Sequence, residues 1–334
     1  MSLYRTWRPR SFSDLVGQDA VVRTLTAAIE GGKLAHAYLF SGPRGSGKTS
    51  AAKILARCID CVNGPTATPD NSCENCLAIL SGTALDVLEI DAASNRGIDE
   101  IRALRDAVKF APSSMRMKVY VIDEAHMLTK EGANAFLKTL EEPPPHAVFI
   151  LATTEPEKLP VTILSRCQRY AFRRIAIPVM IAKMQEIARA EGIAADEGAL
   201  AAIAYRADGG LRDALTMLEQ AAAFAGGERI TPQILDRAFG ATGREFAEAV
   251  LDATVARDAA GALAAIERAS DAGADMHVLT RALIAAFRNA LVARVDPDLL
   301  ARDLAPEDAQ RAAERAKVLP QAAGVRALRL LTDA

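Results

Sequence analysis

The sequence predicts an α/β domain with a parallel sheet, followed by a small helical domain and an all-α C-terminal domain. Three observations predict this fold class. Strand-like runs alternate with helical patterns as far as Phe172, such runs disappear after Arg174, and the rest of the chain shows apolar residues at helical spacing. Because domains of about 150 residues are common, we expect two or three domains in these 334 residues.

Four runs are typical of strands: AYLF before position 41, DVLEI at 86 to 90, KVYVID at 118 to 123 and AVFILATT at 147 to 154. Runs such as VYVI and VFIL are apolar without a period of two, as expected when helices cover both faces of a parallel sheet. Helical patterns separate the runs, as in βαβ units. We therefore expect an α/β domain over residues 1–174.

The second domain is expected over residues 175–240. One helical pattern opens at Pro178 and ends near Gly192, a second covers roughly 196 to 207, and a third follows Gly209 and Gly210. Residues 241–334 are alanine-rich and helical throughout, which favours close helix packing. Two interpretations stay open for this third domain: a free-standing helical bundle and an oligomerisation domain.

Charge and composition exclude several classes of protein. Lys and Arg number 40 and Asp and Glu number 42, a net charge of −2, so any contact with nucleic acid must be local. The start, MSLYRTWRPRSF, has no apolar run behind its positive charges, and no stretch approaches about 18 consecutive apolar residues. These patterns exclude a signal peptide and a membrane span, so we expect a cytoplasmic protein. The chain stops in LRLLTDA without a polar tail, which leaves open a longer native chain.

The segment GPRGSGKT at 42 to 49 matches the phosphate-binding pattern GxxxxGK[ST] and lies between a predicted strand and a predicted helix. Its glycines allow the backbone N–H groups to point inward at an anion, and the helix adds the positive end of its dipole. Lys48 would reach the β- and γ-phosphates, and the Thr49 hydroxyl would bind Mg²⁺. The residues expected to hold the nucleotide here are Gly42, Gly45, Ser46, Gly47, Lys48, Thr49 and Ser50.

Two adjacent acids follow the strand-like run VYVI. Asp123 would hold Mg²⁺ through its water shell, and Glu124 would orient and activate an attacking water. The alternative is a pair of exposed acids in a loop. The phosphate-binding segment upstream and the βαβ pattern between the two motifs favour the catalytic interpretation.

Ordered motifs give the chain a family resemblance. They are WRPRSFSDLVGQ at 7 to 18, DEAHMLTKEGANAFLKTLEEPP at 123 to 144, KLPVTILSRC at 158 to 167 and GGLRDAL at 209 to 215, together with the two motifs above. From about residue 3 to 240 the chain closely resembles the gamma/tau subunits of bacterial DNA polymerase III, the AAA+ ATPases of the clamp loader. The helical C-terminal part fits the collar domain of that family more loosely. The resemblance implies a P-loop AAA+ domain, a helical lid and a collar.

The resemblance also implies roles for four further residues. Val16 in LVGQ matches the segment that lines the adenine pocket, and Thr154 matches the polar sensor position at the end of its strand. Arg166 matches the arginine finger, which reaches the ATP of a neighbouring subunit and suits phosphate because a guanidinium is always charged. Arg212 matches the second sensor, which couples the lid to the nucleotide. For both arginines the alternative is a surface ion pair, and for Thr154 it is a β-forming residue that ends a strand.

Four of the five cysteines lie between positions 58 and 76. In the family, an insertion after the P-loop helix binds zinc with the pattern C-x8-C-x2-C-x2-C, and the matching residues here are Cys61, Asp70, Cys73 and Cys76. An Asp can complete a tetrahedral Zn²⁺ site with three thiolates. Cys58 competes for the fourth position by spacing, but it falls on the apolar face of the helix, so we interpret it as core. The alternative to a structural zinc site is a loop without metal, and Cys167 is expected to be a small buried residue.

The implied function is that of the clamp-loader motor, which uses ATP and Mg²⁺ to load the sliding clamp onto primed DNA. The implied partners are the delta and delta-prime subunits, sister gamma/tau copies, the sliding clamp and primer–template DNA, in the cytoplasm at the nucleoid. A C-terminal extension, if the native chain has one, would contact the polymerase and the helicase. Arg96 and Lys138 are the candidates for contact with the DNA backbone, with solvated surface charges as the alternative.

The residues present argue against three rival interpretations. A non-hydrolysing subunit of the same ring would lack Lys48 or Glu124, and both are present. A Holliday-junction helicase would need β-hairpin signals after residue 240, and none is visible. A small subunit of replication factor C is nearer, but the cysteine insertion favours the bacterial branch.

Overall fold

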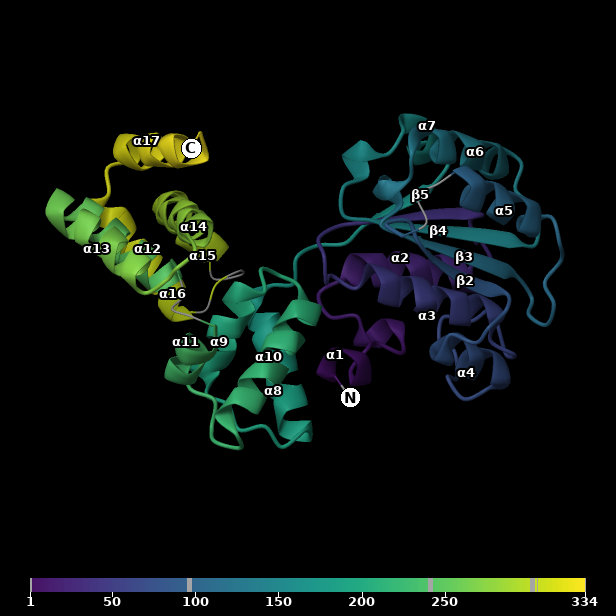
Figure 1. The fold of residues 1–334 in the computed structure, drawn as a ribbon, viewed down its shortest axis with the longest axis horizontal. Coiled ribbons are helices and arrows are strands. Elements are labelled where there is room, and N and C mark those ends of the chain that lie inside the picture. Colours follow the sequence, from purple (N-terminus) through teal and green to yellow (C-terminus); the bar gives the residue numbers. More distant parts are fainter. Residues whose placement is uncertain (1, 95–97, 240–242, 301–303, 305, 334) are drawn as a thin grey trace. The chain divides into compact units, whose positions relative to one another are not determined.

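The chain forms two compact units in a computed structural model, which describes residues 2–94, 98–239, 243–300, 304 and 306–333. The first unit comprises Leu3–Ile175 with Gly209–Arg212, and the second comprises Ala176–Asp208 with Asp213–Ala334. Figure 1 follows the chain from the purple N-terminal helices through the sheet to the yellow C-terminal helices.

The first unit is built on a parallel sheet of five strands. The strands are β1 (Ala37–Ser41), β2 (Val87–Asp91), β3 (Lys118–Asp123), β4 (Ala147–Thr153) and β5 (Gln168–Ala171), in the order β2-β3-β4-β1-β5. Because all the strands run the same way, their carboxyl ends share one edge of the sheet. In the register, Ser41 is opposite Thr153, and Asp91 is opposite Asp123.

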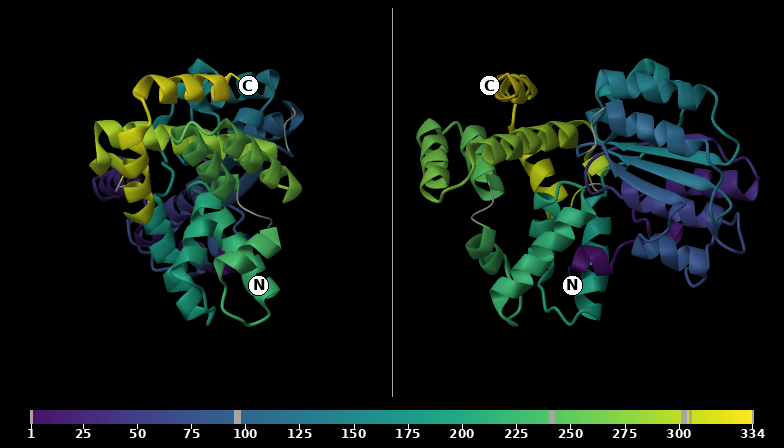
Figure 2. Two further views of the ribbon diagram at one scale, coloured as in Figure 1. Left: turned by 90° about the vertical axis from the view of Figure 1, so that its left-hand side faces the viewer. Right: turned by 45° about the vertical axis from the view of Figure 1, so that its right-hand side comes forward.

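Helices cover both faces of this sheet (Figures 1 and 2). On one face, Tyr38, Phe40, Val119 and Val121 pack in the cluster that contains α2 (Asp19–Glu30) and α3 (Lys48–Asp60). The alternate strand residues face the cluster of α5 (Ile98–Val108), α6 (Lys130–Glu141) and α7 (Val161–Leu164). This double burial explains why the strand sequences are apolar without alternation.

Sequence analysis missed the strand β5. Its four residues, QRYA, show three exposed positions, and only Tyr170 is buried. An edge strand of this kind carries too few apolar residues to be recognised in the sequence. Its pairing with β1 nevertheless matters, because it brings Phe172 beside the P-loop.

Short elements complete the first unit. They are α1 (Leu3–Thr6), α4 (Glu74–Ser81) and three 3₁₀ turns at Phe12–Asp14, Ala125–Met127 and Pro156–Lys158.

The second unit is helical throughout its described residues. Its first helices are α8 (Ile177–Ala190), α9 (Glu197–Arg206), α10 (Leu211–Ala225, which begins in the first unit) and α11 (Pro232–Phe239). The later helices are α12 (Gly243–Val255), α13 (Ala259–Asp271), α14 (Met276–Val295), α15 (Pro297–Leu300), α16 (Pro306–Val318) and α17 (Gln321–Thr332). The two groups are joined inside this unit by the Tyr205 hydroxyl of α9, which donates a hydrogen bond to the Asp308 carboxylate of α16.

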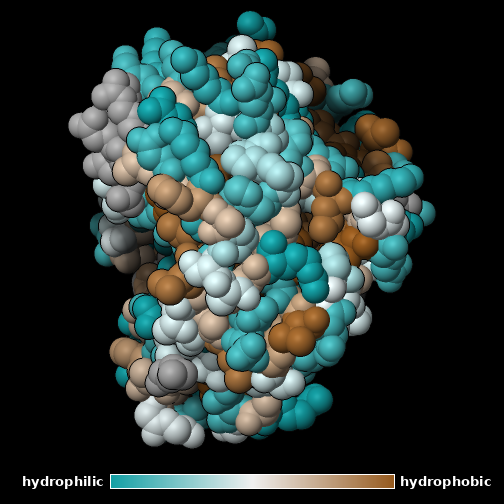
Figure 3. Space-filling view, turned by 90° about the vertical axis from the view of Figure 1, so that its right-hand side faces the viewer, coloured by the Kyte–Doolittle hydropathy of each residue, from teal (hydrophilic) through white to brown (hydrophobic). Residues whose placement is uncertain are grey.

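No described helix is both long enough and apolar enough to cross a lipid bilayer. Figure 3 shows hydrophobic residues scattered among hydrophilic ones on the face it displays, without one continuous apolar area. Scattered exposed apolar residues are normal on a protein surface.

Asp86 anchors the loop that precedes β3. Its carboxylate is fully buried and accepts hydrogen bonds from the backbone N–H groups of Ser113, Ser114 and Met115, at 2.8, 2.8 and 3.0 Å. Burial acts to raise the pKa of Asp86, but these hydrogen bonds outweigh it and hold the pKa below its usual value.

We predict that Asp86→Asn destabilises the first unit by about 2–4 kcal/mol at pH 7, because the buried N–H groups lose a charged acceptor. The folded pKa is depressed, so this stabilisation is present above the unfolded pKa of about 3.9 and is lost as the pH falls through the folded value. The difference between variant and parent should therefore shrink at acidic pH. Urea unfolding followed by the fluorescence of Trp7, which is the single Trp and lies in this unit, measures it.

Asp106→Asn is the matched control, since Asp106 is exposed and its carboxylate is bonded to the Lys109 side chain. Equal unfolding midpoints for Asp86→Asn and Asp106→Asn at pH 7 would contradict the anchoring role of Asp86.

Candidate functional site

The P-loop has the backbone that its glycines permit. Gly45 and Gly47 adopt φ of +74° and +99°, which residues with a side chain rarely adopt. A Cβ at Gly42 would lie 2.4 Å from the Phe172 carbonyl oxygen, and one at Gly45 would lie 2.9 Å from Gly210 Cα. Both positions therefore require glycine. Their close contacts place the loop between the residue that follows β5 and the segment before α10.

Lys48 is buried at the first turn of α3, and its Nζ donates hydrogen bonds to the carbonyl oxygens of Gly42 (2.7 Å) and Pro43 (2.8 Å). Burial lowers the pKa of Lys48, while the Glu124 and Asp123 carboxylates act to raise it. The ammonium group thus lies inside the loop beside two acids, where it can meet a phosphate group.

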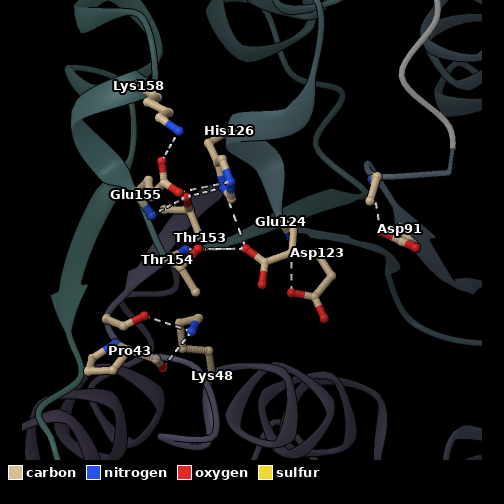
Figure 4. Close-up of polar contacts among 12 residues, drawn as sticks. Pro43, Lys48, Asp91, Asp123, Glu124, His126, Thr153, Thr154, Glu155 and Lys158 are labelled. Atoms are coloured by element: carbon tan, nitrogen blue, oxygen red, sulfur yellow. Dashed lines mark hydrogen bonds and ion pairs between the residues drawn. The ribbon is translucent and has the colours of Figure 1, made fainter. Parts of the chain in front are cut away.

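The end of β3 brings the two acids to the loop (Figure 4). Thr49 Oγ1 donates a hydrogen bond to Asp123 Oδ2 at 2.8 Å, which places two oxygen ligands suited to a hard cation side by side. The Glu124 carboxylate turns instead toward β4, where its Oε2 accepts hydrogen bonds from Thr154 N (3.3 Å) and Thr154 Oγ1 (3.1 Å). The residues present therefore fit Mg²⁺ and a nucleotide phosphate.

The backbone of Glu124 is strained. Its φ and ψ are both +47°, in the left-handed region that a residue with a side chain rarely adopts. Such strain costs of the order of 1–3 kcal/mol and persists where the surroundings enforce it, which happens most at functional sites.

His126 belongs to this network, although sequence analysis did not select it. Its Nδ1 lies 3.0 Å from Thr153 Oγ1 and 3.4 Å from Glu124 Oε2, and its Nε2 lies 3.9 Å from Glu155 Oε1 (Figure 4). The ring is nearly buried, so it has little freedom to move and helps to hold the Glu124 carboxylate in its orientation toward β4. The sequence could have indicated this residue, because the histidine follows Glu124 by two positions in DEAH.

The segment before α2 closes the other side of the loop. Leu15 Cδ2 lies 3.2 Å from where a Cβ of Gly47 would be, and the neighbouring Val16 is half-buried. Gln18, which sequence analysis did not single out, is buried and donates from Nε2 to the carbonyl oxygens of Ser46 (3.2 Å) and Arg173 (2.8 Å). Gln18 therefore ties the P-loop to the chain that follows β5.

The remaining residues predicted to hold the nucleotide lie as follows. Ser46 is buried and its hydroxyl donates to the Pro43 carbonyl oxygen at 2.7 Å, and Ser50 is half-buried in the first turn of α3. Arg212 begins α10 beside the loop, with its Cβ 3.6 Å from where a Cβ of Gly45 would be and its guanidinium 4.8 Å from the centre of the Tyr4 ring.

Arg166 lies apart from this group. Its Nη2 pairs with Glu141 Oε1 on α6 at 2.6 Å, and its Nη1 donates to the Thr162 carbonyl oxygen at 2.7 Å. Its side chain is 32% exposed. Within the described chain, none of its hydrogen bonds reaches the P-loop or the two acids.

Four side chains of types that can bind a metal meet between α3 and α4. The donor atoms of Cys61, Asp70, Cys73 and Cys76 all lie within 4.8 Å of one another. Sulfur ligands of a tetrahedral zinc site are about 3.8 Å apart, given Zn–S bonds of about 2.3 Å, so the cluster could hold a metal. Cys58 lies instead in the hydrophobic core, where burial raises the pKa of its thiol to about 12. Cys167 is buried in the other core cluster.

One of the two candidates for DNA contact can be placed. Lys138 is exposed on α6, and Arg96 lies outside the described residues.

These features define the class of the protein: an AAA+ P-loop ATPase with a lid. Solved structures of the same fold include the Thermotoga maritima RuvB Holliday junction branch migration motor, with a TM-score of 0.53 over 75% of this chain and 79% of that chain. Its sequence identity of 20% shows a shared fold alone.

Models of three families match consecutive parts of the chain. They are described as DNA polymerase III, delta subunit (residues 17–176), DNA polymerase III clamp loader subunit, ATPase lid domain (180–227), and DNA polymerase III subunits gamma and tau domain III (231–331). The chain belongs to the gamma/tau family of DNA polymerase III clamp-loader subunits.

Curated relatives carry the same names. DNA polymerase III subunit tau of Bacillus subtilis is 56% identical over 67% of this chain and 40% of its own length. The gamma/tau subunit of Mycobacterium tuberculosis H37Rv is 42% identical over 92% of this chain and 54% of its own, and subunit tau of Escherichia coli K12 is 40% identical over 95% and 49%. The chain thus spans about half the length of the curated relatives it matches.

We predict that the purified chain carries one equivalent of bound metal in the cysteine cluster. Cys73→Ser should lower the bound metal to well under half an equivalent, because the cluster loses one thiolate. Elemental mass spectrometry after gel filtration measures the stoichiometry. Cys167→Ala is the matched control and should retain the metal, and a wild-type chain that lacks metal after purification without chelators would contradict the prediction.

Proposed function

We propose that the chain binds and hydrolyses ATP. The observation that carries this proposal is a connected set of hydrogen bonds beside Lys48, which is formed by Thr49, Asp123, Glu124 and Thr154. In this proposal the P-loop N–H groups and Lys48 hold the phosphates, and Thr49 and Asp123 hold Mg²⁺. The metal supplies charge neutralisation on the phosphates when bound. Glu124 takes the proton of the attacking water, and Thr154 holds the carboxylate in place.

Two further nucleotide contacts are proposed from where Val16 and Arg212 lie beside the P-loop. Val16 would line the adenine pocket, and Arg212 would contact the phosphates from the start of α10, which supports a coupling between nucleotide and lid. The proposed domains are the AAA+ domain at 1–174 with the insertion at 58–76, the lid at 175–240 and the collar at 241–334, where assembly with sister subunits would take place.

Arg166 is proposed as the finger that completes the site of a neighbouring subunit. Its partial exposure and its contacts away from the P-loop of its own chain support this role. The pair with Glu141 would then have to open when the guanidinium engages the phosphate of the neighbour. A phosphate group can take the place of the Glu141 carboxylate, because a guanidinium group donates paired hydrogen bonds to either anion.

The proposed biological role is that of the motor subunit of the bacterial replicative clamp loader. ATP binding would create affinity for the sliding clamp and primed DNA, and hydrolysis would release the clamp on DNA. The partners would be the delta and delta-prime subunits and sister copies, with Arg96 and Lys138 facing the DNA backbone. A longer native chain would contact the polymerase and the helicase. The cysteine cluster would hold structural Zn²⁺, since four protein ligands leave no position for a substrate.

The test is steady-state ATP turnover of the chain mixed with bacterial delta and delta-prime subunits, with and without sliding clamp and primed DNA. Turnover should rise several-fold only when clamp and DNA are both present. Arg166→Ala should abolish this rise, so that turnover with clamp and DNA falls several-fold, to the unstimulated rate, because the finger no longer reaches the neighbouring ATP. Arg169→Ala is the matched control, because Arg169 lies three residues away and donates to a backbone carbonyl. An ATP turnover rate that is unchanged by the addition of clamp and DNA would contradict the clamp-loader role.

A second prediction separates binding from hydrolysis. Glu124→Gln should leave the affinity for a fluorescent ATP analogue within about twofold and lower the turnover at least 100-fold, because the amide cannot accept the proton of the water. Glu157→Gln, which changes an exposed acid two residues beyond Glu155, should retain the parental rate. Equal rates for the two variants would remove Glu124 from the proposed mechanism.

A further inference from the structure

A basic pocket lies between the N-terminal segment, α3 and α4, on the first unit. Five cationic side chains line it: Arg5, Arg8, Arg10, Lys53 and Arg57. Its volume is about 390 Å³, and no acidic residue and no residue of the P-loop is among those that line it in the described chain. We call it the N-terminal basic pocket.

The deepest cation of this pocket is incompletely satisfied. Arg57 is 1% exposed, and its Nη2 donates to the Arg10 carbonyl oxygen at 2.7 Å, but its Nε is buried without a hydrogen-bond partner. Burial lowers the pKa of Arg57, and the positive charges of Arg8 and Arg10 lower it further. Cys76 and Cys58 act to raise this pKa, but they do not outweigh burial. A buried polar group without a partner is costly, so Arg57 adds an incompletely satisfied, buried cation to the wall of the pocket.

The charges around Arg57 are only partly balanced. Lys53 pairs with Glu89 at 2.5 Å, and Arg5 donates to the Tyr4 hydroxyl at 3.1 Å. The guanidinium groups of Arg8 and Arg10 make no hydrogen bond or ion pair with another described residue. The pocket therefore concentrates positive charge in a chain whose net charge is −2.

The walls of the pocket are held in position. Lys53 and Arg57 are four residues apart on α3, so they share one face of a helix that packs against the sheet. The Asp14 carboxylate accepts the backbone N–H groups of Arg10 and Ser11, both at 2.9 Å, and so fixes the segment that carries Arg8 and Arg10. The cations are thus presented by a prepared surface, which reduces the entropy lost on binding.

We propose that the N-terminal basic pocket is a second anion site, separate from the P-loop, that binds a phosphate group. Guanidinium groups suit this ligand because they donate paired hydrogen bonds to phosphate oxygens. The phosphate can belong to a free polyphosphate or to a nucleic acid backbone, since the chemistry of recognition is the same.

The test uses the full chain with Mg²⁺ and a non-hydrolysable ATP analogue at saturation, so that the P-loop does not take up the probes. Calorimetry measures binding of inorganic pyrophosphate, and fluorescence anisotropy measures binding of a labelled single-stranded and a labelled duplex oligonucleotide at several salt concentrations. The variant is Arg8→Gln/Arg10→Gln, which leaves the buried Arg57 in place. The control is Arg23→Gln/Lys33→Gln, which removes the same charge from exposed positions.

We expect the pocket variant to bind at least one probe 10-fold more weakly or worse, while the control stays within about twofold of the parent. Loss of pyrophosphate binding identifies a free polyphosphate as the source. Loss of oligonucleotide binding, with a salt dependence reduced by about two counterions, identifies the nucleic acid backbone. If neither probe binds the parent chain, or if both variants weaken binding equally, the pocket is not an anion site and the proposal is overturned.

Discussion

The hydrogen bond from Thr49 Oγ1 to Asp123 Oδ2 joins the start of α3 to the end of β3, across 74 positions of sequence. Only the parallel register brings these ends together, with Ser41 opposite Thr153 and Ile122 opposite Leu151. In an open parallel sheet the carboxyl ends meet at one edge, where ligands bind. A slip of one residue in β3 would turn its side chains to the other face and separate the hydroxyl from the carboxylate.

The same edge explains why Glu124 can remain in a strained conformation. The residue follows β3 directly, and its carboxylate is held by Thr154 beyond the end of the adjacent strand β4. His126, two residues further along the chain, contacts both that carboxylate and Thr153. Because the carboxylate and the histidine are both fixed by β4, the left-handed backbone at Glu124 has no easy route to relax. The strain and the position of the candidate base therefore have one cause.

The sequence predicted the central strands and the motif residues because their signals are local. β3 and β4 are continuous apolar runs, the P-loop is eight consecutive residues, and the candidate metal ligands follow one another at short spacing. The order of the strands could not be predicted, and with it the contacts of Glu124 with Thr154 and of Arg166 with Glu141 stayed unknown. Gln18 was missed for the same reason, since its partner Arg173 is 155 positions away. The strand β5 was missed because an edge strand with one buried residue has little apolar pattern.

Helix α3 connects three features that sequence analysis treated separately. It begins at Lys48 in the P-loop, carries Lys53 and Arg57 into the basic pocket, and ends at Asp60, directly before Cys61, whose sulfur belongs to the candidate metal cluster. The apolar side of the helix is buried against the sheet, so it cannot tilt without disturbing the core.

Three thiolates and one carboxylate around a divalent metal would carry a net charge of −2, and Arg57 lies near enough for Cys76 to act on its pKa. The buried guanidinium therefore lies between the two features: Cys76 of the cluster acts on its pKa, and the same side chain lines the basic pocket. Because α3 carries Arg57 on a helix packed against the sheet, the distance between the cluster and the pocket is set by the core of the first unit.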